Sequence, residues 1–303
     1  CNPAQAVNVT DTMKKQILDA CRKLGYEIRK VGDTNDAANY EKYFDAASIR
    51  KRNFYNIGAG KFVHPCWTNI DITDEHFQPG NDGGVTGILY DLFLHQPIPV
   101  ATDSAELIYS SHTIEHIDDA SLQNMLNESY RMLKPGGAIR LVTPDADNAY
   151  RAWKNNDRSY FFWIEWEEMN KNLEKQCITM PLQDASLTQI FLEDFAAAAS
   201  VIAAEGNTFR LDDAAVHKLF QEKSFEDAMN YCTSLCSVEQ QRKYPFRHMN
   251  WFNEKKLRRM LTDAGFKTIY RSGFSQSAFP VLRNTHFFDK TLPQISLYME
   301  AVK

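Results

Sequence analysis

The sequence predicts an α/β fold in which a parallel β-sheet is covered by helices on both faces. Two observations support this prediction. Between residues 54 and 143, short apolar runs that end in turns alternate with helical segments, and the alternation resumes after residue 250. Residues 145–248, between these parts, follow a helical pattern rich in charged and aromatic side chains. We therefore expect one sheet-based domain with a helical insert after the fifth strand.

The first fifty residues predict an N-terminal helical segment, 1–50, ahead of the sheet. Residues 11–24 repeat apolar side chains at helical spacing behind a Thr-Asp cap, which indicates an amphipathic helix. A second helix is expected over residues 37–51. The apolar positions of the first helix are Met13, Ile17, Leu18, Cys21 and Leu24.

Short apolar runs bounded by turns then predict the strands of the sheet. Two helices are expected between strands, one over residues 118–133 and one over 253–264. The turn Lys134-Pro135-Gly136-Gly137 should stop the first of them, and Gly265 should close the second. The predicted strands cover residues 54–57, 67–71, 85–90, 106–110, 138–143, 266–271 and 294–302.

Composition and charge argue against two classes of partner. The net charge is -5 and there is no block of like charge, so the positive surface that nucleic acid requires is missing as a global feature. No apolar run approaches the roughly 20 residues of a membrane-spanning helix. We expect neither a nucleic-acid partner nor a membrane partner.

The six cysteines indicate a reducing compartment, because their spacing does not suit a disulfide framework. Cys232 and Cys236 lie one helical turn apart and could share a metal ion, but no nearby His or Cys pair completes the set, so packing is the favoured role. The chain begins at Cys1 rather than Met, which we interpret as a cut, and no secretion signal follows. A cytoplasmic protein is expected.

A candidate ligand site lies where the first three strands end. Gly58-Ala59-Gly60 follows the first strand and lets the backbone approach a ligand closely. Asp71 ends the second strand, where a carboxylate can accept hydrogen bonds from ribose hydroxyls. Asp91 ends the third, where it could take the exocyclic amine of an adenine while Leu92 packs on the ring. A tight turn without a ligand remains an alternative for the glycines alone.

Three segments together resemble a known family. Residues 54–72, 103–117 (with Ser-Ser-His-Thr-Ile-Glu-His-Ile) and 132–145 (with Leu-Lys-Pro-Gly-Gly) look like the class I S-adenosylmethionine-dependent methyltransferases, closest to the subgroup with an Asn-Ile-Gly-x-Gly first motif. The likeness covers residues 50–147 well and 250–302 in outline. It implies a Rossmann-like sheet of seven strands, mostly parallel with an antiparallel last strand. It also implies S-adenosylmethionine as cofactor and S-adenosylhomocysteine as product.

Two departures from the family pattern bear on the cofactor. In the first departure, Asn56 stands where the family commonly has an acidic residue, although an asparagine can still hydrogen-bond an amino acid moiety. In the second, Lys61-Phe62 stand where the family commonly has a third glycine. A dinucleotide-binding turn needs a small residue at the third glycine position so that the helix N-terminus reaches the pyrophosphate. S-adenosylmethionine has no phosphate, so this second departure disfavours NAD more than S-adenosylmethionine. The expected cofactor-binding residues are Asn56, Gly58, Ala59, Gly60, Asp71, Ile72, Asp91, Leu92, Ser110 and Ser111.

Three residues are candidates for catalysis. His112 directly follows the fourth strand and is the expected base, the alternative being that it caps the next helix or orders the cofactor. His116 could line the same cleft, although packing is the favoured role. Asp145 should face the cleft with Asp147 close by. That pair could hold a divalent ion, but a helix-capping Pro-Asp turn explains it better, and no metal is expected.

The helical insert supplies the candidate substrate-binding residues. Aromatic faces could hold a sugar or a cationic acceptor, with core packing the alternative for each ring. Residues near the return of the insert could orient a polar substrate or anchor the returning helix. The candidates are Trp163, Trp166, Arg247, His248 and Trp251.

The favoured hypothesis is a methyltransferase acting on a small polar acceptor, first of all an oxygen of a sugar or sugar-derived metabolite. Residues 51–145 and 249–303 would form the cofactor-binding domain, and 146–248 the substrate-binding cap. One alternative is an inactive binding module whose aromatic cap holds a partner. Another is an NAD-dependent oxidoreductase. The acceptor, the methylated atom and the oligomeric state are left open.

Overall fold

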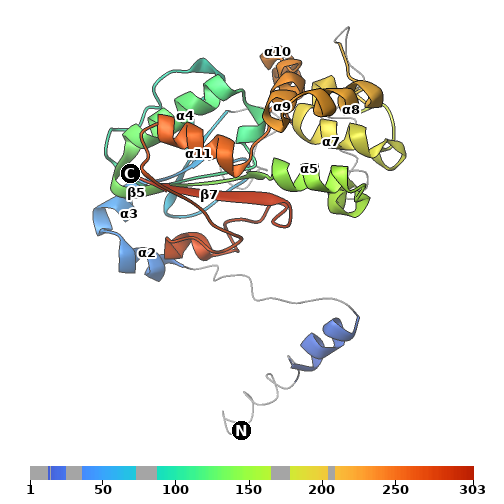
Figure 1. Ribbon diagram of the computed structural model, residues 1–303. Coiled ribbons are helices and arrows are strands. Elements are labelled where there is room, and N and C mark those ends of the chain that lie inside the picture. The colour runs from blue at the N-terminus through green and yellow to red at the C-terminus, as the bar shows by residue number, and fades with distance from the viewer. Residues whose placement is uncertain (1–12, 14, 25–35, 73–86, 165–177, 204–208) are drawn as a thin grey trace.

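The structure is a computed structural model of the 303-residue chain, and it describes residues 13, 15–24, 36–72, 87–164, 178–203 and 209–303. Within these residues, no helix combines the length and the apolar character needed to cross a membrane. The trace in Figure 1 shows the sheet at the centre, helices above and below it, and a helical cap at one end.

The sheet has seven strands in the order β3-β2-β1-β4-β5-β7-β6. Strands β1 to β5 pair in parallel, and β7 runs antiparallel to both β5 and β6. This arrangement confirms the predicted fold class, including the antiparallel last strand. The strands are β1 (Phe54–Ile57), β2 (Trp67–Asp71), β3 (Gly87–Leu89), β4 (Ala105–Ser111), β5 (Leu133–Pro144), β6 (Thr268–Arg271) and β7 (Ser296–Val302).

Each face of the sheet has its own apolar core. Helices α4 (Asp119–Met132) and α11 (Glu254–Asp263) cover one face, and α2 (Ala37–Tyr43) and α3 (Ala46–Lys51) lie on the other side (Figure 1). The two strong helices begin at polar caps, because the side chains of Asp118 and Asn253 each accept a hydrogen bond from a backbone N–H of the first turn. The first core includes Leu122, Met125, Leu126, Leu257, Met260 and Leu261, and the second includes Tyr40, Phe54, Trp67, Tyr109 and Phe288.

The helical cap follows β5 and has a third core of its own. Its central helix is α7 (Leu187–Ala196), in which every residue after Leu187 is buried. Around it lie α5 (Ala146–Lys154), α8 (Asp213–Glu222), α9 (Phe225–Ser234) and α10 (Val238–Lys243). The short 3-10 helices are η1 (Leu92–Leu94), η2 (Ile114–His116), η3 (Arg158–Phe161), η4 (Leu182–Asp184), η5 (Ala197–Ala199) and η6 (Pro280–Arg283).

Two predicted element boundaries are wrong. The helix expected over 37–51 is two helices, because Phe44 is extended (φ -131°, ψ 154°) and the Asp45 side chain caps α3 afresh. The predicted turn at 134–137 lies inside β5: Leu133 pairs with Ala105 and Ala138 with Leu107, so three extra residues form a bulge. Gly136 has φ 83°, a backbone conformation that glycine adopts without steric strain, so the chain can form the bulge here.

The predicted N-terminal amphipathic helix is present, and among the described residues three of its five predicted apolar side chains are exposed. Residues 15–23 are helical, and Met13, Ile17 and Leu24 are 59, 49 and 74% exposed. The Thr-Asp cap predicted for it lies outside the described residues, as do residues 85 and 86 of the predicted third strand.

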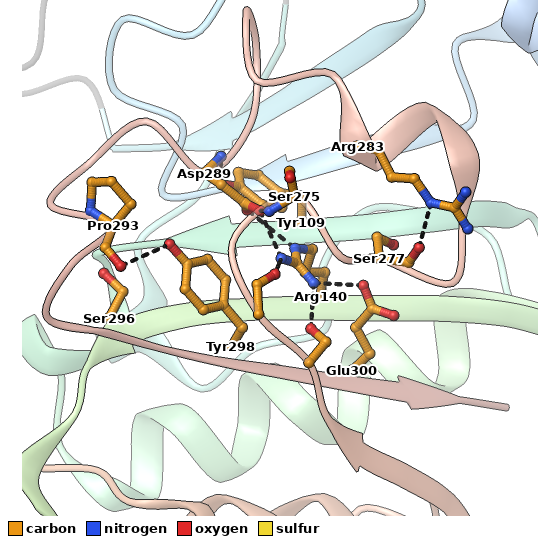
Figure 2. A network of polar contacts seen from close by, with 12 residues as sticks. Tyr109, Arg140, Ser275, Ser277, Arg283, Asp289, Pro293, Ser296, Tyr298 and Glu300 are labelled. Carbon is orange, nitrogen blue, oxygen red and sulfur yellow. Dashed lines mark hydrogen bonds and ion pairs between the residues drawn. The ribbon is translucent and has the colours of Figure 1, made fainter. Parts of the chain in front are cut away.

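A buried ion network on β5 ties the strand to the C-terminal part of the chain (Figure 2). Arg140 is fully buried and uses all five guanidinium N–H groups. It donates to both carboxylate oxygens of Asp289 at 3.1 and 2.6 Å and to Glu300 at 2.7 Å. The Ser272 hydroxyl and the Gly273 carbonyl accept the remaining two bonds, at 2.7 and 2.9 Å.

Candidate active site

A cavity of about 460 Å³ opens beyond the carboxyl ends of β1 to β4. Open parallel sheets bind their ligands at this edge, and the volume is in the range typical of small-molecule sites. The cap adds Gln241, Arg242, Pro245 and Phe246 to its wall, and Thr291 comes from the loop before β7. The lining includes Gly58, Ala59, Gly60, Asp71, Ile72, Asp91, Leu92, Ser111, His112 and His116, all of which the sequence singled out.

The glycine turn is held in place by its contact with the loop after β4. Gly58 has φ 68°, and a Cβ atom there would lie 2.1 Å from the Thr113 methyl carbon, so only glycine fits. Gly60, at φ 50°, has open space around the position of a Cβ atom. Its N–H donates to Asp71 Oδ2 at 2.6 Å. The turn therefore presents bare backbone to the cavity.

Asp71 connects the glycine turn to the end of β2. Its second oxygen accepts the Ile72 N–H at 2.7 Å. Burial raises the pKa of the Asp71 carboxyl, and the backbone N–H groups of Gly60 and Ile72 oppose that rise. Each carboxylate oxygen has two lone pairs, so the group keeps acceptor capacity for ligand hydroxyls at the cavity wall.

Asp91 links the sheet to the cap. Its Oδ1 accepts the Phe93 N–H at 2.9 Å and caps η1. Its Oδ2 lies 2.7 Å from Arg242 Nη2 of α10, and the same guanidinium lies 5.2 Å from the centroid of the Phe93 ring. The Arg242 side chain is 46% exposed. A single exposed arginine thus joins α10 to the rim of the cavity.

His112 lies on the cavity wall in a constrained conformation. Its φ of 49° is in the left-handed region, which a non-glycine residue adopts at a cost of order 1–3 kcal/mol. Its Nδ1 lies 3.1 Å from Glu115 Oε1 and its Nε2 lies 2.9 Å from Ser296 Oγ. Both ring nitrogens therefore have protein partners. For one nitrogen of His112 to offer a free lone pair to a ligand, its contact with Glu115 or with Ser296 must open.

Glu115 is a buried carboxylate behind His112. Its side chain is 1% exposed, and Oε2 accepts a hydrogen bond from Thr143 Oγ1 at 3.1 Å. Burial alone would raise the pKa of Glu115, but the contact with His112 and the nearby His116 and His248 bring it down to about 2. Glu115 is therefore ionised at neutral pH.

His116 and His248 meet where the cap returns to the sheet. Their ring centroids are 4.7 Å apart at an interplanar angle of 75°. His116 Nδ1 lies 2.9 Å from the Arg247 carbonyl, and His248 Nδ1 lies 2.8 Å from the Asp194 carbonyl. Burial lowers the pKa of both imidazoles, that of His248 to about 4. Burial also raises the pKa of Asp194 well above its usual range, and Glu193 adds to this rise.

Asn56 and Ser110 are buried beneath the cavity rather than exposed in it. Asn56 pairs with Tyr109 across β1 and β4, so strand alternation puts Asn56 and Ser111 on the same face of the sheet. Asn56 Oδ1 and Ser111 Oγ are buried and have no hydrogen-bond partner among the described residues. Such unsatisfied oxygens at the carboxyl ends of two strands are suited to a polar ligand.

Asp145 does not line the cavity. It is 1% exposed, caps α5 by accepting the Asp147 N–H at 3.1 Å, and pairs with Arg271 at 2.8 Å. Burial raises the pKa of the Asp145 carboxyl, and Arg271 opposes the rise. Its contacts are those of a helix cap and an ion pair.

The proposed substrate-binding residues of the cap lie mostly in its core. Trp163 and Trp251 are 7 and 1% exposed, and Trp251 donates its indole N–H to Asn230 at 2.9 Å. Arg247 is buried, with its guanidinium 4.3 Å from the Tyr244 ring centroid. His248 contacts His116, as described above. Trp166 lies outside the described residues.

Several residues in the cavity wall, and Glu115 behind it, were not predicted as site residues from the sequence. Glu115 stands inside the Ser-Ser-His-Thr-Ile-Glu-His-Ile segment, and that placement was a usable signal. Thr113 also lies in that segment, but only the approach to Gly58 reveals its role. Residues of α10 and the following loop carry no motif. The missed lining residues include Thr113, Tyr90, Phe93, Gln241, Arg242, Phe246 and Thr291.

Comparison with known proteins gives a family and several similar structures. The family described as a methyltransferase domain matches residues 17–270. No curated protein matches the sequence. An S-adenosylmethionine-dependent methyltransferase from Mesorhizobium loti is 11% identical, with 82% of this chain and 90% of that chain covered and a TM-score of 0.37. One from Archaeoglobus fulgidus is 12% identical, with 89 and 100% covered and a TM-score of 0.38.

Human N-acetylserotonin methyltransferase in complex with S-adenosylmethionine is 13% identical, with a TM-score of 0.36. The alignment covers 88% of this chain but 54% of the human one, so this chain spans about half its length. At such TM-scores these likenesses carry no inference about the activity of this chain.

Proposed function

The chain belongs to the methyltransferase-domain family matched over residues 17–270, and from this premise we propose that it transfers a methyl group to a small polar acceptor. The methyl donor is S-adenosylmethionine and the product is S-adenosylhomocysteine. We also propose the chemical class of the acceptor, and our first choice is an oxygen of a sugar or sugar-derived metabolite.

The observation that carries the proposal is the set of polar groups around the bare glycine turn. Gly58 and Gly60 line the cavity without side chains, so their backbone would meet a ligand directly. Asp71 would hold the ribose hydroxyls and Asp91 the adenine amine, at the ends of neighbouring strands. The unpartnered oxygens of Asn56 and Ser111 would receive the amino acid moiety. The residues present therefore fit this cofactor.

The cofactor supplies an electrophilic methyl group on a sulfonium. Transfer forms a bond between that carbon and an acceptor oxygen, breaks the carbon–sulfur bond, and releases the proton of the hydroxyl. His112 is the proposed acceptor of this proton through Nε2, once the contact with Ser296 Oγ has opened. The ionised Glu115 next to Nδ1 would stabilise the resulting imidazolium.

The sugar hypothesis draws its support from the cavity wall rather than from the tryptophans of the cap. Phe246, Thr291 and His116 line the cavity and offer an aromatic ring, a hydroxyl and an imidazole to a hydroxyl-rich acceptor. A neutral amine attacks without first losing a proton, so removal of the His112 base should slow transfer to a hydroxyl much more than transfer to an amine.

Calorimetric titration of the purified chain with S-adenosylmethionine, S-adenosylhomocysteine and NAD tests the proposal. We expect both sulfur nucleosides to bind and NAD to fail. Asp71→Ala should weaken binding by about 1–3 kcal/mol because ribose hydroxyls lose their acceptor. Asp263→Ala, on the exposed side of α11, is the matched control and should bind as the unaltered chain does.

Three results would contradict the proposal. Failure of both nucleosides to bind would favour the inactive binding module, and binding of NAD alone would favour the oxidoreductase. Unchanged affinity in Asp71→Ala would remove the proposed cofactor site from this cavity.

A further inference from the structure

We propose that Glu115, His116 and His248 bind a divalent transition-metal ion at the junction of sheet and cap. This site goes beyond the proposed methyl transfer and differs from the sequence expectation of no metal. Each residue offers one ligand atom, a carboxylate oxygen or an imidazole nitrogen, and these atoms lie within 4.8 Å of one another.

The tautomers of the two histidines suit a metal site. In each ring Nδ1 faces a backbone carbonyl oxygen, that of Arg247 for His116 and that of Asp194 for His248, at 2.9 and 2.8 Å. A carbonyl only accepts, so Nδ1 carries the proton and the lone pair of the neutral ring is on Nε2. Histidine ligands of metals typically donate their other N–H to a carbonyl or carboxylate in this way.

Glu115 adds a carboxylate with spare capacity. It is 1% exposed, and Thr143 orients it through Oε2. Oε1 has no hydrogen bond among the described residues, although His112 Nδ1 lies 3.1 Å away. This ionised oxygen keeps lone-pair capacity beyond the His112 contact, and a bound cation would use it.

Backbone hydrogen bonds hold the three ligands together. The N–H groups of Met249 and Asn250 both donate to the Glu115 carbonyl, at 2.9 and 3.2 Å. The Ala197 N–H donates to the His248 carbonyl at 3.0 Å. The returning end of the cap is thereby fixed to η2, so His248 is held beside His116 by main chain from two elements. Such a preformed ligand set suits metal binding.

Two imidazoles and one carboxylate form a recurring ligand set for Zn²⁺, which leaves a fourth position open. Tetrahedral ligands about 2.1 Å from Zn²⁺ lie roughly 3.4 Å apart, so the side chains must approach one another by roughly 1 Å. Rotation of the rings can supply this movement. His116 also lines the cavity, so a ligand in the cavity could reach the ion.

Titration of the tag-free, chelator-stripped full chain with Co²⁺ tests the site, with competition by Zn²⁺. We expect one Co²⁺ per chain, visible d–d absorption, and displacement by Zn²⁺. His248→Gln and Glu115→Gln should each weaken Co²⁺ binding by about tenfold to a hundredfold or more. His217→Gln, an exposed histidine on α8, is the control and should leave binding unchanged.

Two results overturn the proposal. One is the absence of a saturable visible band on addition of Co²⁺. The other is a folded His248→Gln variant that binds Co²⁺ as tightly as the unaltered chain. Strong thiolate charge-transfer absorption also overturns it, because the ion would then be at cysteines such as Cys232 and Cys236. Circular dichroism checks the fold of each variant, and if one ligand variant unfolds, the other decides. Cofactor is absent throughout, so failure here is distinct from failure of the methyltransferase proposal.

Discussion

Two buried polar clusters, one around Arg140 on β5 and one around Glu115 in η2, differ in how completely their groups are paired. Around Arg140, all five guanidinium donors reach acceptors in β7 and the C-terminal loops (Figure 2). Around Glu115, a carboxylate oxygen has no hydrogen bond among the described residues, and two imidazoles direct Nδ1 to carbonyls. The satisfied cluster is suited to fixing structure, and the under-satisfied cluster to binding something else.

The largest effect is expected where the pairing is complete. Arg140→Met should lower the free energy of unfolding by about 3–5 kcal/mol, because Asp289 and Glu300 would remain as buried charges without their partner. Urea unfolding followed by circular dichroism measures this. Arg283→Gln is the control, since in the described part of the chain that exposed guanidinium donates only to the carbonyls of Ser277 and Ala278. A loss below 1 kcal/mol in Arg140→Met would mean that the network does not fix structure.

The next effect concerns turnover rather than stability. His112→Ala should reduce the rate of methyl transfer about a hundredfold, or about 2.7 kcal/mol in the barrier, while cofactor binding persists. Single-turnover kinetics with a hydroxyl acceptor would measure it. Ser296→Ala, which frees Nε2, should keep most of the rate. If His112→Ala loses less than threefold, the residue only packs.

A third prediction uses the histidines of the under-satisfied cluster. Burial is the main cause that lowers the pKa of His248 to about 4, and the nearby His116 adds to it. Between pH 6.5 and 4 the His248 ring is therefore protonated in the unfolded chain but neutral in the folded protein. The contribution of His248 to the free energy of unfolding should therefore fall as the pH drops from about 6.5 to 4, by about 2 kcal/mol after allowing for the 21% exposure of the ring. The raised pKa of the neighbouring Asp194 acts in the opposite direction, so the effect is read as the difference between the unaltered chain and His248→Gln.

Urea titrations of metal-free protein at several pH values test this pH dependence. His248→Gln should flatten the curve over that pH range, whereas His217→Gln should not. A His248→Gln variant with the same slope as the unaltered chain would show that His248 is not the responsible group. Because the pKa of Glu115 is about 2, its charge stays constant over the range.

The smallest effect is expected at the exposed pair between Arg242 and Asp91. Arg242→Gln should weaken cofactor binding by at most about fivefold, since exposed ion pairs contribute about 0.2–1 kcal/mol. Calorimetry at low and high salt should show that the difference between the two chains shrinks as salt rises. A loss above tenfold would place Arg242 among the groups that contact the cofactor.

Local sequence patterns were sufficient to predict the sheet and the glycine turn. β1 and β2 occur where apolar runs end in Gly58 and Asp71, because strand patterning and turn chemistry are properties of neighbouring residues. The bulge at Gly136 was missed because proline and glycine normally mark a turn, and only pairing with β4 keeps these residues in the strand.

The polar cluster could be predicted only in part. His112 and His116 follow β4 directly, so their motif located them, whereas His248 reaches them through a cap whose path depends on tertiary packing. The same limit explains Arg242, which no motif marks. Trp163 and Trp251 lie in the cap core rather than on the cavity wall, because burying a large ring stabilises the fold.

The two stems of the cap have a consequence for how ligands enter. The Ala146 N–H donates to the Phe252 carbonyl at 2.9 Å, so the outgoing and returning chains are bonded to each other beside the sheet. In the described part of the chain, this bond opposes a swing of the whole cap. The six-residue α10 contacts the cavity rim through the exposed Arg242, so a local displacement of that helix is the smaller movement that would widen the entrance for the cofactor.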